Sequence, residues 1–207
     1  MKEVNSYGWK AVIGSSIGYA MDGFDLLILG FMLTLISGDL GLTTGQAGSL
    51  VTWTLVGAVI GGFIFGTLSD KFGRVRVLTW TIVLFAVLTG LCAFAQGYWD
   101  LLIYRTIAGI GLGGEFGIGM ALAAEAWPAQ HRAKATSYVA IGWQLGVLAA
   151  ALLTPVLLPY IGWRGMFMVG IIPAFVAWFF RAKLHEPEIF VQSKEIKEHS
   201  HTNSFKL

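Results

Sequence analysis

Residues 46–96 read QAGSLVTWTLVGAVIGGFIFGTLSDKFGRVRVLTWTIVLFAVLTGLCAFAQ, two apolar runs on either side of a short charged turn. Each run is long enough, at 1.5 Å per helical residue, to cross the ~30 Å hydrocarbon core of a bilayer. All charged side chains of this stretch fall within the turn, between Ser69 and Val77. The pattern therefore predicts two antiparallel membrane helices joined by a tight polar loop.

The same alternation extends over most of the chain. Hydrophobic residues make up 56% of the 207 residues and charged residues only 13%, about half the charged share of a soluble domain. Unpaired backbone groups cannot lie in lipid, and the ~10-residue alternating segments of a membrane β-barrel are not visible, so each span is expected to be a helix. We predict an all-α integral membrane protein with six transmembrane helices, at residues 11–37, 46–69, 77–96, 101–127, 135–160 and 165–181.

The basic residues predict the orientation. Twelve of the 14 Lys and Arg side chains lie in the segments before, between and after the spans on one side, and the opposite loops at 38–45 and 97–100 contain none. Basic loops stay in the cytoplasm, so both termini are expected to be cytoplasmic in a multi-pass protein of the cell membrane. The predicted divisions are a cytoplasmic N-terminus at 1–10, a membrane bundle at 11–181 and a cytoplasmic tail at 182–207, with an amphipathic surface helix at 188–198.

Ionisable side chains inside the spans are the candidate functional residues, because each costs about 2.5–3.5 kcal/mol at a helix centre and so needs a reason. Asp25 and Glu115 each lie 14 residues into their spans, roughly 21 Å along the helix and near the midplane. Asp22 lies one turn before Asp25, on the same helix face. Burial and mutual repulsion disfavour two charged carboxylates there, which suits a group that binds and releases a proton. Arg105 lies about 15 Å outward of Glu115, too far for a direct bond, and is better placed to attract an anion.

Other interpretations of these polar groups remain open. Asp22, Asp25, Arg105 and Glu115 can equally form interhelical packing pairs. Gln144 can hydrogen-bond a ligand or merely another helix. No nucleophile with an oriented base, metal-ligand cluster or phosphate-binding loop is visible, so we expect no enzyme activity, no metal and no cofactor, and no nucleic-acid partner.

A spacing repeats across the two halves of the predicted bundle. Gly57 is followed sixteen positions later by Gly73 and Arg74, and Gly146 is followed sixteen positions later by Gly162. The first of these turns is cytoplasmic and the second external. The pairing suits two three-helix repeats of opposite topology, a common construction in secondary transporters.

The charged turn carries a motif that resembles a known family. Gly66, Leu68, Asp70, Gly73 and Arg74 match every fixed position of the pattern G-x-L-x-D-x-x-G-R, the signature loop of the major facilitator superfamily. The fourth span, with Arg105, its glycines and the group Glu125, Pro128 and Arg132, looks like that family's fourth-helix pattern. The segments DGFD at 22–25, GEFG at 114–117 and EAWP at 125–128 are similar to sialate and carboxylate proton symporters, and aromatic-acid proton symporters share the first segment.

The resemblance implies a role for each matching position. The cytoplasmic gate would comprise Gly66, Asp70, Gly73, Arg74, Glu125 and Arg132. Asp22 and Asp25 would couple protons, and Arg105 and Glu115 would face the central cavity. The fifth span lacks the Gly-Pro pair of the antiporter branch, which favours uptake by symport over export.

The resemblance also implies a partner for this bundle. Members of the superfamily have twelve spans in two six-helix bundles, with the substrate between them, and one such half-bundle is predicted here. The second half would lie on the same or a separate chain, or a second copy would supply it. We therefore expect half of a proton-coupled symporter for a small organic anion such as sialate, lactate or an aromatic acid. The alternatives are a transporter of a sugar or other neutral solute, and a half-bundle that depends on a partner or does not transport.

Overall fold

The computed structural model describes residues 6–181, and every long element among them is a helix. A 3₁₀ turn at Ala129–His131 precedes the last helix. The bounds are α1 at Ser6–Leu40, α2 at Thr44–Phe72, α3 at Arg74–Cys92, α4 at Tyr98–Glu125 and α5 at Arg132–Arg181. Each of these helices contains a window apolar enough to cross a membrane. The prediction of an all-α membrane protein is confirmed, whereas the predicted tail at 182–207 and its surface helix at 188–198 lie outside the described residues.

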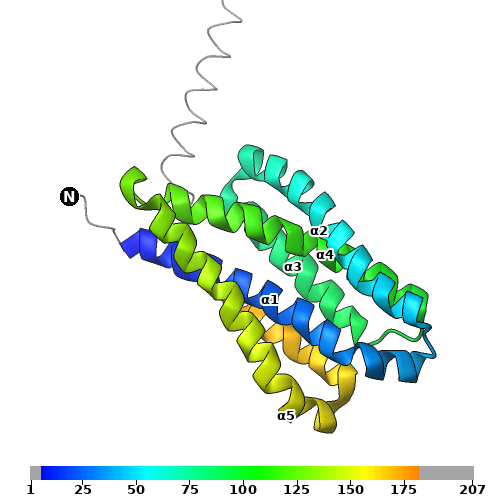
Figure 1. Cartoon of the computed structure of the whole chain (residues 1–207). Helices are drawn as coiled ribbons and strands as arrows, with labels where there is room; N and C mark the ends of the chain where they lie inside the picture. The colour runs from blue at the N-terminus through cyan, green and yellow to red at the C-terminus, as the bar shows by residue number, and fades with distance from the viewer. Residues whose placement is uncertain (1–5, 182–207) are drawn as a thin grey trace, which may run out of the picture.

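Helix α5 contains the last two predicted spans. Gly162 has φ 64° and ψ 179°, so the helix is interrupted there, and the chain doubles back toward its starting end, as the yellow-to-orange ribbon shows (Figure 1). Positive φ is costly for residues with a side chain, which explains glycine at this reversal. Residues 6–181 thus cross the bundle six times. The third predicted span was too long, because α3 ends at Cys92 and residues 93–96 form the turn before α4.

Local signals in the sequence account for the ends of α2. Thr43 caps its N-terminus, because the Thr43 hydroxyl accepts from the Gln46 backbone N–H at 3.3 Å and the Gln46 side chain accepts from the Thr43 N–H at 2.9 Å. This reciprocal arrangement satisfies two helix-end donors. At the other end Gly73 has φ 110°, which lets α3 begin at the next residue.

The helices pack most extensively in two pairs, α1 with α5 and α2 with α4. In each pair a glycine lets the backbones touch: a Cβ on Gly57 would overlap the Thr106 carbonyl oxygen, and a Cβ on Gly146 would overlap the Ala20 carbonyl oxygen. Small residues allow this approach between membrane helices. Gly57 and Gly146 are 89 positions apart, and Ala20 and Thr106 are 86 apart. The two contacts therefore relate α1 to α4 and α2 to the first part of α5, in agreement with the predicted three-helix repeat.

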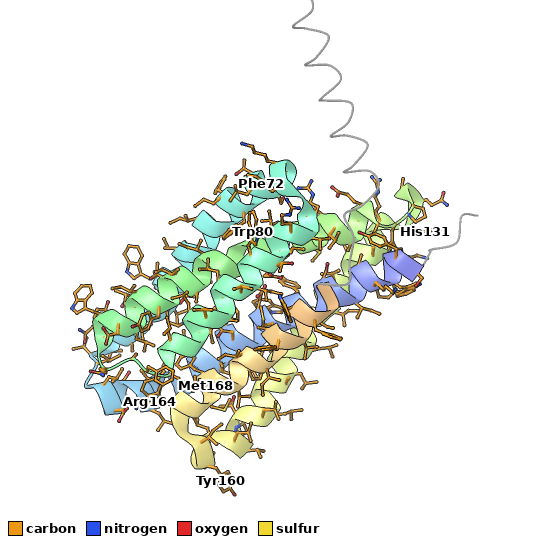
Figure 2. The ribbon with its side chains drawn as sticks, turned by 180° about the vertical axis from the view of Figure 1, so that it is seen from behind. Phe72, Trp80, His131, Tyr160, Arg164 and Met168 are labelled. Atoms are coloured by element: carbon orange, nitrogen blue, oxygen red, sulfur yellow. The ribbon has the colours of Figure 1, made fainter. Side chains whose placement is uncertain are left out.

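The two ends of the bundle carry different turns. Phe72 and His131 lie at one end and Tyr160 and Arg164 at the other (Figure 2). The start of α1 belongs to the first end, because the Trp127 indole N–H after α4 donates to the Gly8 carbonyl at 3.0 Å. The loops predicted to be cytoplasmic thus meet at one end, and the loops predicted to be external meet at the other.

Candidate functional site

A groove of about 540 Å³ runs between α1, α2, α4 and α5. Its walls are mostly apolar, with Leu55, Val59 and Phe63 contributed by α2. The polar groups in its described lining are the Tyr19 hydroxyl, the Asp22 carboxylate and the Trp143 indole N–H. Asp22 lines the groove although none of its surface is exposed, which places the carboxylate at the floor. It lies sixteen residues into α1, about 24 Å from the start of the helix. An ionisable group is thus held at mid-helix depth beside a space that a small molecule can enter.

Three aromatic rings form the wall next to Asp22. Tyr19 lies 5.1 Å, between ring centroids, from Phe116 of α4 and also 5.1 Å from Trp143 of α5. The Phe116 ring is 51% exposed, and all three rings line the groove. These residues were missed in the sequence, where aromatic side chains in apolar spans carry no distinguishing signal.

Asp25 lies one turn after Asp22 but faces the bundle interior. The Arg105 guanidinium donates from Nη1 to Asp25 Oδ1 at 3.0 Å and from Nη2 to Oδ2 at 2.7 Å, and both side chains are fully buried. The structure therefore brings Asp25 and Arg105 together, and neither is among the residues that line the groove. The pair gives Arg105 the compensating partner that its position in a membrane helix requires. Direct contact between Arg105 and a transported anion stays a prediction.

Glu115 and Gln144 lie apart from that pair. Glu115 is buried, and its Oε1 accepts a hydrogen bond from the Thr81 hydroxyl of α3 at 2.7 Å. Gln144 is exposed on α5. It lies two residues from both Gly142 and Gly146, which contact α1, and therefore on the side of α5 that faces away from α1. The five predicted binding residues thus occupy four separate places.

The predicted cytoplasmic gate centres on Arg74. Its guanidinium donates to Asp70, to the Ser69 hydroxyl at 2.7 Å and to Glu125 Oε1 at 3.1 Å. The Arg74 side chain is only 16% exposed. Burying a cation costs free energy unless hydrogen-bond and ion-pair partners of this kind compensate. This cluster ties the α2–α3 turn to the end of α4.

The other predicted gate residues are less involved. Gly73 forms the turn, whereas Gly66 remains helical within α2 and accepts from the Ser69 hydroxyl at 2.8 Å. Arg132 is exposed at the start of α5 and makes no ion pair within residues 6–181. The described part of the chain also contains no group of three His, Cys, Asp or Glu side chains close enough to hold a metal.

A second polar cluster at the opposite end was not singled out in the sequence. Asp39 at the end of α1 accepts from Arg164 at 2.6 Å and from the Trp163 indole N–H at 3.0 Å. Arg164 lies 4.0 Å over the Trp163 ring and also donates to the Ala95 carbonyl at 3.3 Å. A signal for this cluster was the repeated glycine spacing, because an arginine follows each of the two turn glycines, Arg74 one position after Gly73 and Arg164 two positions after Gly162.

Comparisons with known proteins agree with this architecture. The family model described as Major Facilitator Superfamily matches residues 15–206. A putative metabolite transport protein of Haemophilus influenzae is 81% identical over 93% of this chain and 47% of its own length. A sialic acid transporter of Escherichia coli is 33% identical over 93% of this chain and 48% of its own length. The chain thus spans about half the length of these relatives.

A solved structure shows the same fold. The xylose transporter from Escherichia coli, in a partially occluded inward-open conformation, superposes with a TM-score of 0.81. The match covers 92% of this chain and 51% of the transporter, at 24% identity. The prediction of one half-bundle of that fold is confirmed.

Proposed function

Because the chain belongs to the major facilitator superfamily, we propose that it forms half of a proton-coupled symporter for a small organic anion, a carboxylate, in the cell membrane. The observation that carries this proposal is Asp22, fully buried at the floor of an apolar groove at mid-helix depth. A second six-helix half, on the same or another chain, would cover the groove. The sialic acid transporter among the relatives supports a carboxylate substrate.

Charge balance explains why an anion would travel with a proton. An ionised Asp22 repels a second negative charge from the groove, and the described residues that line the groove include no Lys, Arg or His. Proton binding to Asp22 removes that repulsion and adds an O–H donor that can hydrogen-bond the substrate carboxylate. The doubly loaded half then carries one negative charge fewer than the half that holds the anion alone, which lowers the cost of moving through the membrane.

The other predicted residues would act around Asp22. Asp25 is one helical turn away and is held by Arg105, so we assign this pair a positioning role in which Arg105 fixes the part of α1 that carries Asp22. Glu115, hydrogen-bonded to Thr81, is proposed as a second proton carrier. Gln144 is proposed to hydrogen-bond a ligand or the second half from the exposed side of α5.

We assign the cluster of Arg74, Asp70 and Glu125 to the cytoplasmic gate. Its hydrogen bonds connect the α2–α3 turn to Glu125 at the end of α4. Both lie at the end of the bundle that is predicted to face the cytoplasm. A second bundle that rocks against this one would close over these charged groups on the cytoplasmic side. Arg132, exposed nearby, is proposed to contact that second bundle.

Uptake by Asp22→Asn tests the proton role. Cells that express the whole gene product are assayed for sialate uptake with and without an imposed inward proton gradient. We expect wild type to respond to the gradient and Asp22→Asn to lose that response, because an amide cannot bind and release the proton. Asp100→Asn, at the external start of α4, is the matched control and is expected to behave as wild type. Gradient-driven uptake by Asp22→Asn equal to wild type would overturn the assignment.

A neutral solute such as a sugar is the second candidate, because the fold matches a xylose transporter and a carboxylate accepts hydrogen bonds from hydroxyl groups. A sugar needs several polar partners, whereas the described lining of the groove supplies only the Tyr19 hydroxyl, the Asp22 carboxylate and the Trp143 indole N–H. Competition separates the two candidates. A carboxylate that inhibits uptake more strongly than its own amide favours the anion, and the reverse order favours the neutral solute.

A further inference from the structure

The aromatic wall of the groove has a shape that the proton role of Asp22 does not explain. Tyr19, Phe116 and Trp143 come from three helices, yet their rings form one continuous surface with tilts of 37° and 44° between neighbours. Such centroid distances are those of interacting aromatic pairs. The Phe116 ring remains 51% exposed, so packing within this bundle does not use its outer face.

Glycines keep the space beside these rings open. Gly117 lines the groove next to Phe116, and a Cβ at this position would meet nothing within 4 Å. Gly62 on α2 also lines the groove, with its nearest contact for a Cβ at 3.6 Å. The rings therefore border an open gap whose lining includes glycine backbone without side chains, which suits a flat ligand.

The polar group lies at the edge of this aromatic surface. Tyr19 and Asp22 are three residues apart and share one face of α1. A ligand with a flat body on the rings would place a carboxylate at its end toward Asp22, whose protonated form donates an O–H to it. A saturated ring of similar size has hydrogens above and below its mean plane and cannot stack in this way.

We propose that Tyr19, Phe116 and Trp143 form a stacking subsite that selects carboxylates with a flat, conjugated body over saturated carboxylates of the same size. This proposal rests on the proposed function, because it requires the groove to receive an organic anion. An aromatic pair adds enough attraction beyond its buried area to favour the flat ligand by about two- to tenfold.

Uptake of two matched acids tests the subsite. Cells expressing the protein as its gene encodes it are assayed with benzoate and with cyclohexanecarboxylate, which have the same number of carbons and the same charge. We expect wild type to take up benzoate at least about twofold faster, and Phe116→Leu to bring the ratio close to one by slowing benzoate alone. Phe116→Tyr keeps the aromatic face and is expected to retain the preference.

Phe63→Leu is the matched control. Phe63 lines the same groove and is 78% exposed, but it forms no ring pair within residues 6–181, so the ratio is expected to stay at the wild-type value. Trp143→Leu gives a second test should Phe116→Leu fail to reach the membrane, as an immunoblot of the membrane fraction reveals. It is expected to lower the ratio in the same way.

Sialate uptake separates failure of this proposal from failure of the proposed function. If wild type takes up sialate but treats the two test acids alike, or takes up neither, the stacking subsite is overturned and the anion symporter stands. If Phe116→Leu and Trp143→Leu slow the uptake of both acids equally, the stacking subsite is also overturned, because such a result indicates that the two side chains serve general packing. If sialate, benzoate and cyclohexanecarboxylate all fail to enter, both proposals fall.

Discussion

The buried pair between Asp25 and Arg105 gives a quantitative test of what holds α1 against α4. Both guanidinium nitrogens Nη1 and Nη2 bond the two carboxylate oxygens, and no part of either side chain reaches solvent. Removing one partner leaves the other charge buried without compensation, which lowers the free energy of unfolding by about 3–5 kcal/mol. Removing both leaves no charge to strand.

A double-mutant cycle measures this coupling. Asp25→Asn nearly preserves the shape of the carboxylate, and Arg105→Met keeps an unbranched chain without the cation. We expect each single variant to lower the free energy of unfolding by about 3–5 kcal/mol, more than a hundredfold in the folding equilibrium. The double variant is expected to lose about 3 kcal/mol less than the sum of the single losses.

Reversible unfolding by sodium dodecyl sulfate in mixed micelles, followed by tryptophan fluorescence, supplies the free energies. Gln144→Met, at an exposed position, controls for the loss of a polar side chain. Ordinary hydrogen bonds between membrane helices contribute about 0.6 kcal/mol on average and at most about 1.7. Single losses in that range that simply add would refute the reasoning, because the pair would then contribute no more than a neutral hydrogen bond.

The same variants separate structure from proton transfer. If Asp25 only positions α1, the double variant, which leaves no unpaired charge in the bundle, is expected to keep gradient-driven uptake. If Asp25 itself carries the proton, uptake is lost in every variant that contains Asp25→Asn, however stable that variant is.

Two further predictions concern the bundle. Gly146→Leu is expected to destabilise the protein by about 1–3 kcal/mol or more, because even the first side-chain carbon overlaps the Ala20 carbonyl oxygen. Thermal unfolding in detergent measures this loss. Gly38→Leu is the control and is expected to change stability little, because a Cβ at Gly38 meets nothing within 4 Å. Arg74→Lys is expected to cost about 1 kcal/mol in the same assay, because the partners are partly exposed and an ammonium lacks the fork that bonds Asp70 and Glu125 together. If Arg74→Lys loses as much stability as Arg74→Ala, the forked bonds of the guanidinium account for the contribution of Arg74. If Arg74→Lys is as stable as wild type, this explanation is wrong.

Hydrophobic pattern predicted the fold because the bilayer leaves few alternatives. An apolar run of this length must be a helix that crosses, and the loops sort by charge. The boundaries were less certain, as residues 93–96 show: their composition is apolar, but Gly97 and Asp100 start a new helix and the chain must turn before them. Composition reports the environment of a residue and not the turn in which it takes part.

Predicting the site required contacts that no linear pattern contains. The Arg74 cluster was predictable because its motif lies within a short stretch that resembles a known loop. The pair of Asp25 and Arg105 joins residues 80 positions apart. The sequence left interhelical pairs among the buried charges open but did not indicate which two would meet. The groove is harder still, because Asp22 and Asp25 lie one turn apart and only about 60° apart around α1. The packing of α4 and α5 alone decides which of them faces the groove.

The repeat connects the two polar ends of the bundle. Asp39 and Glu125 are 86 positions apart, the same offset that relates Ala20 to Thr106, and Arg74 and Arg164 are 90 apart, within one residue of the offset between Gly57 and Gly146. The outer cluster therefore joins the end of α1 to the last crossing just as the inner cluster joins the end of α4 to α3. The two three-helix units are thus joined by ion pairs at both ends of the bundle. These two ion-pair clusters support the proposal that the half-bundle would move as one body if it rocks against a second half.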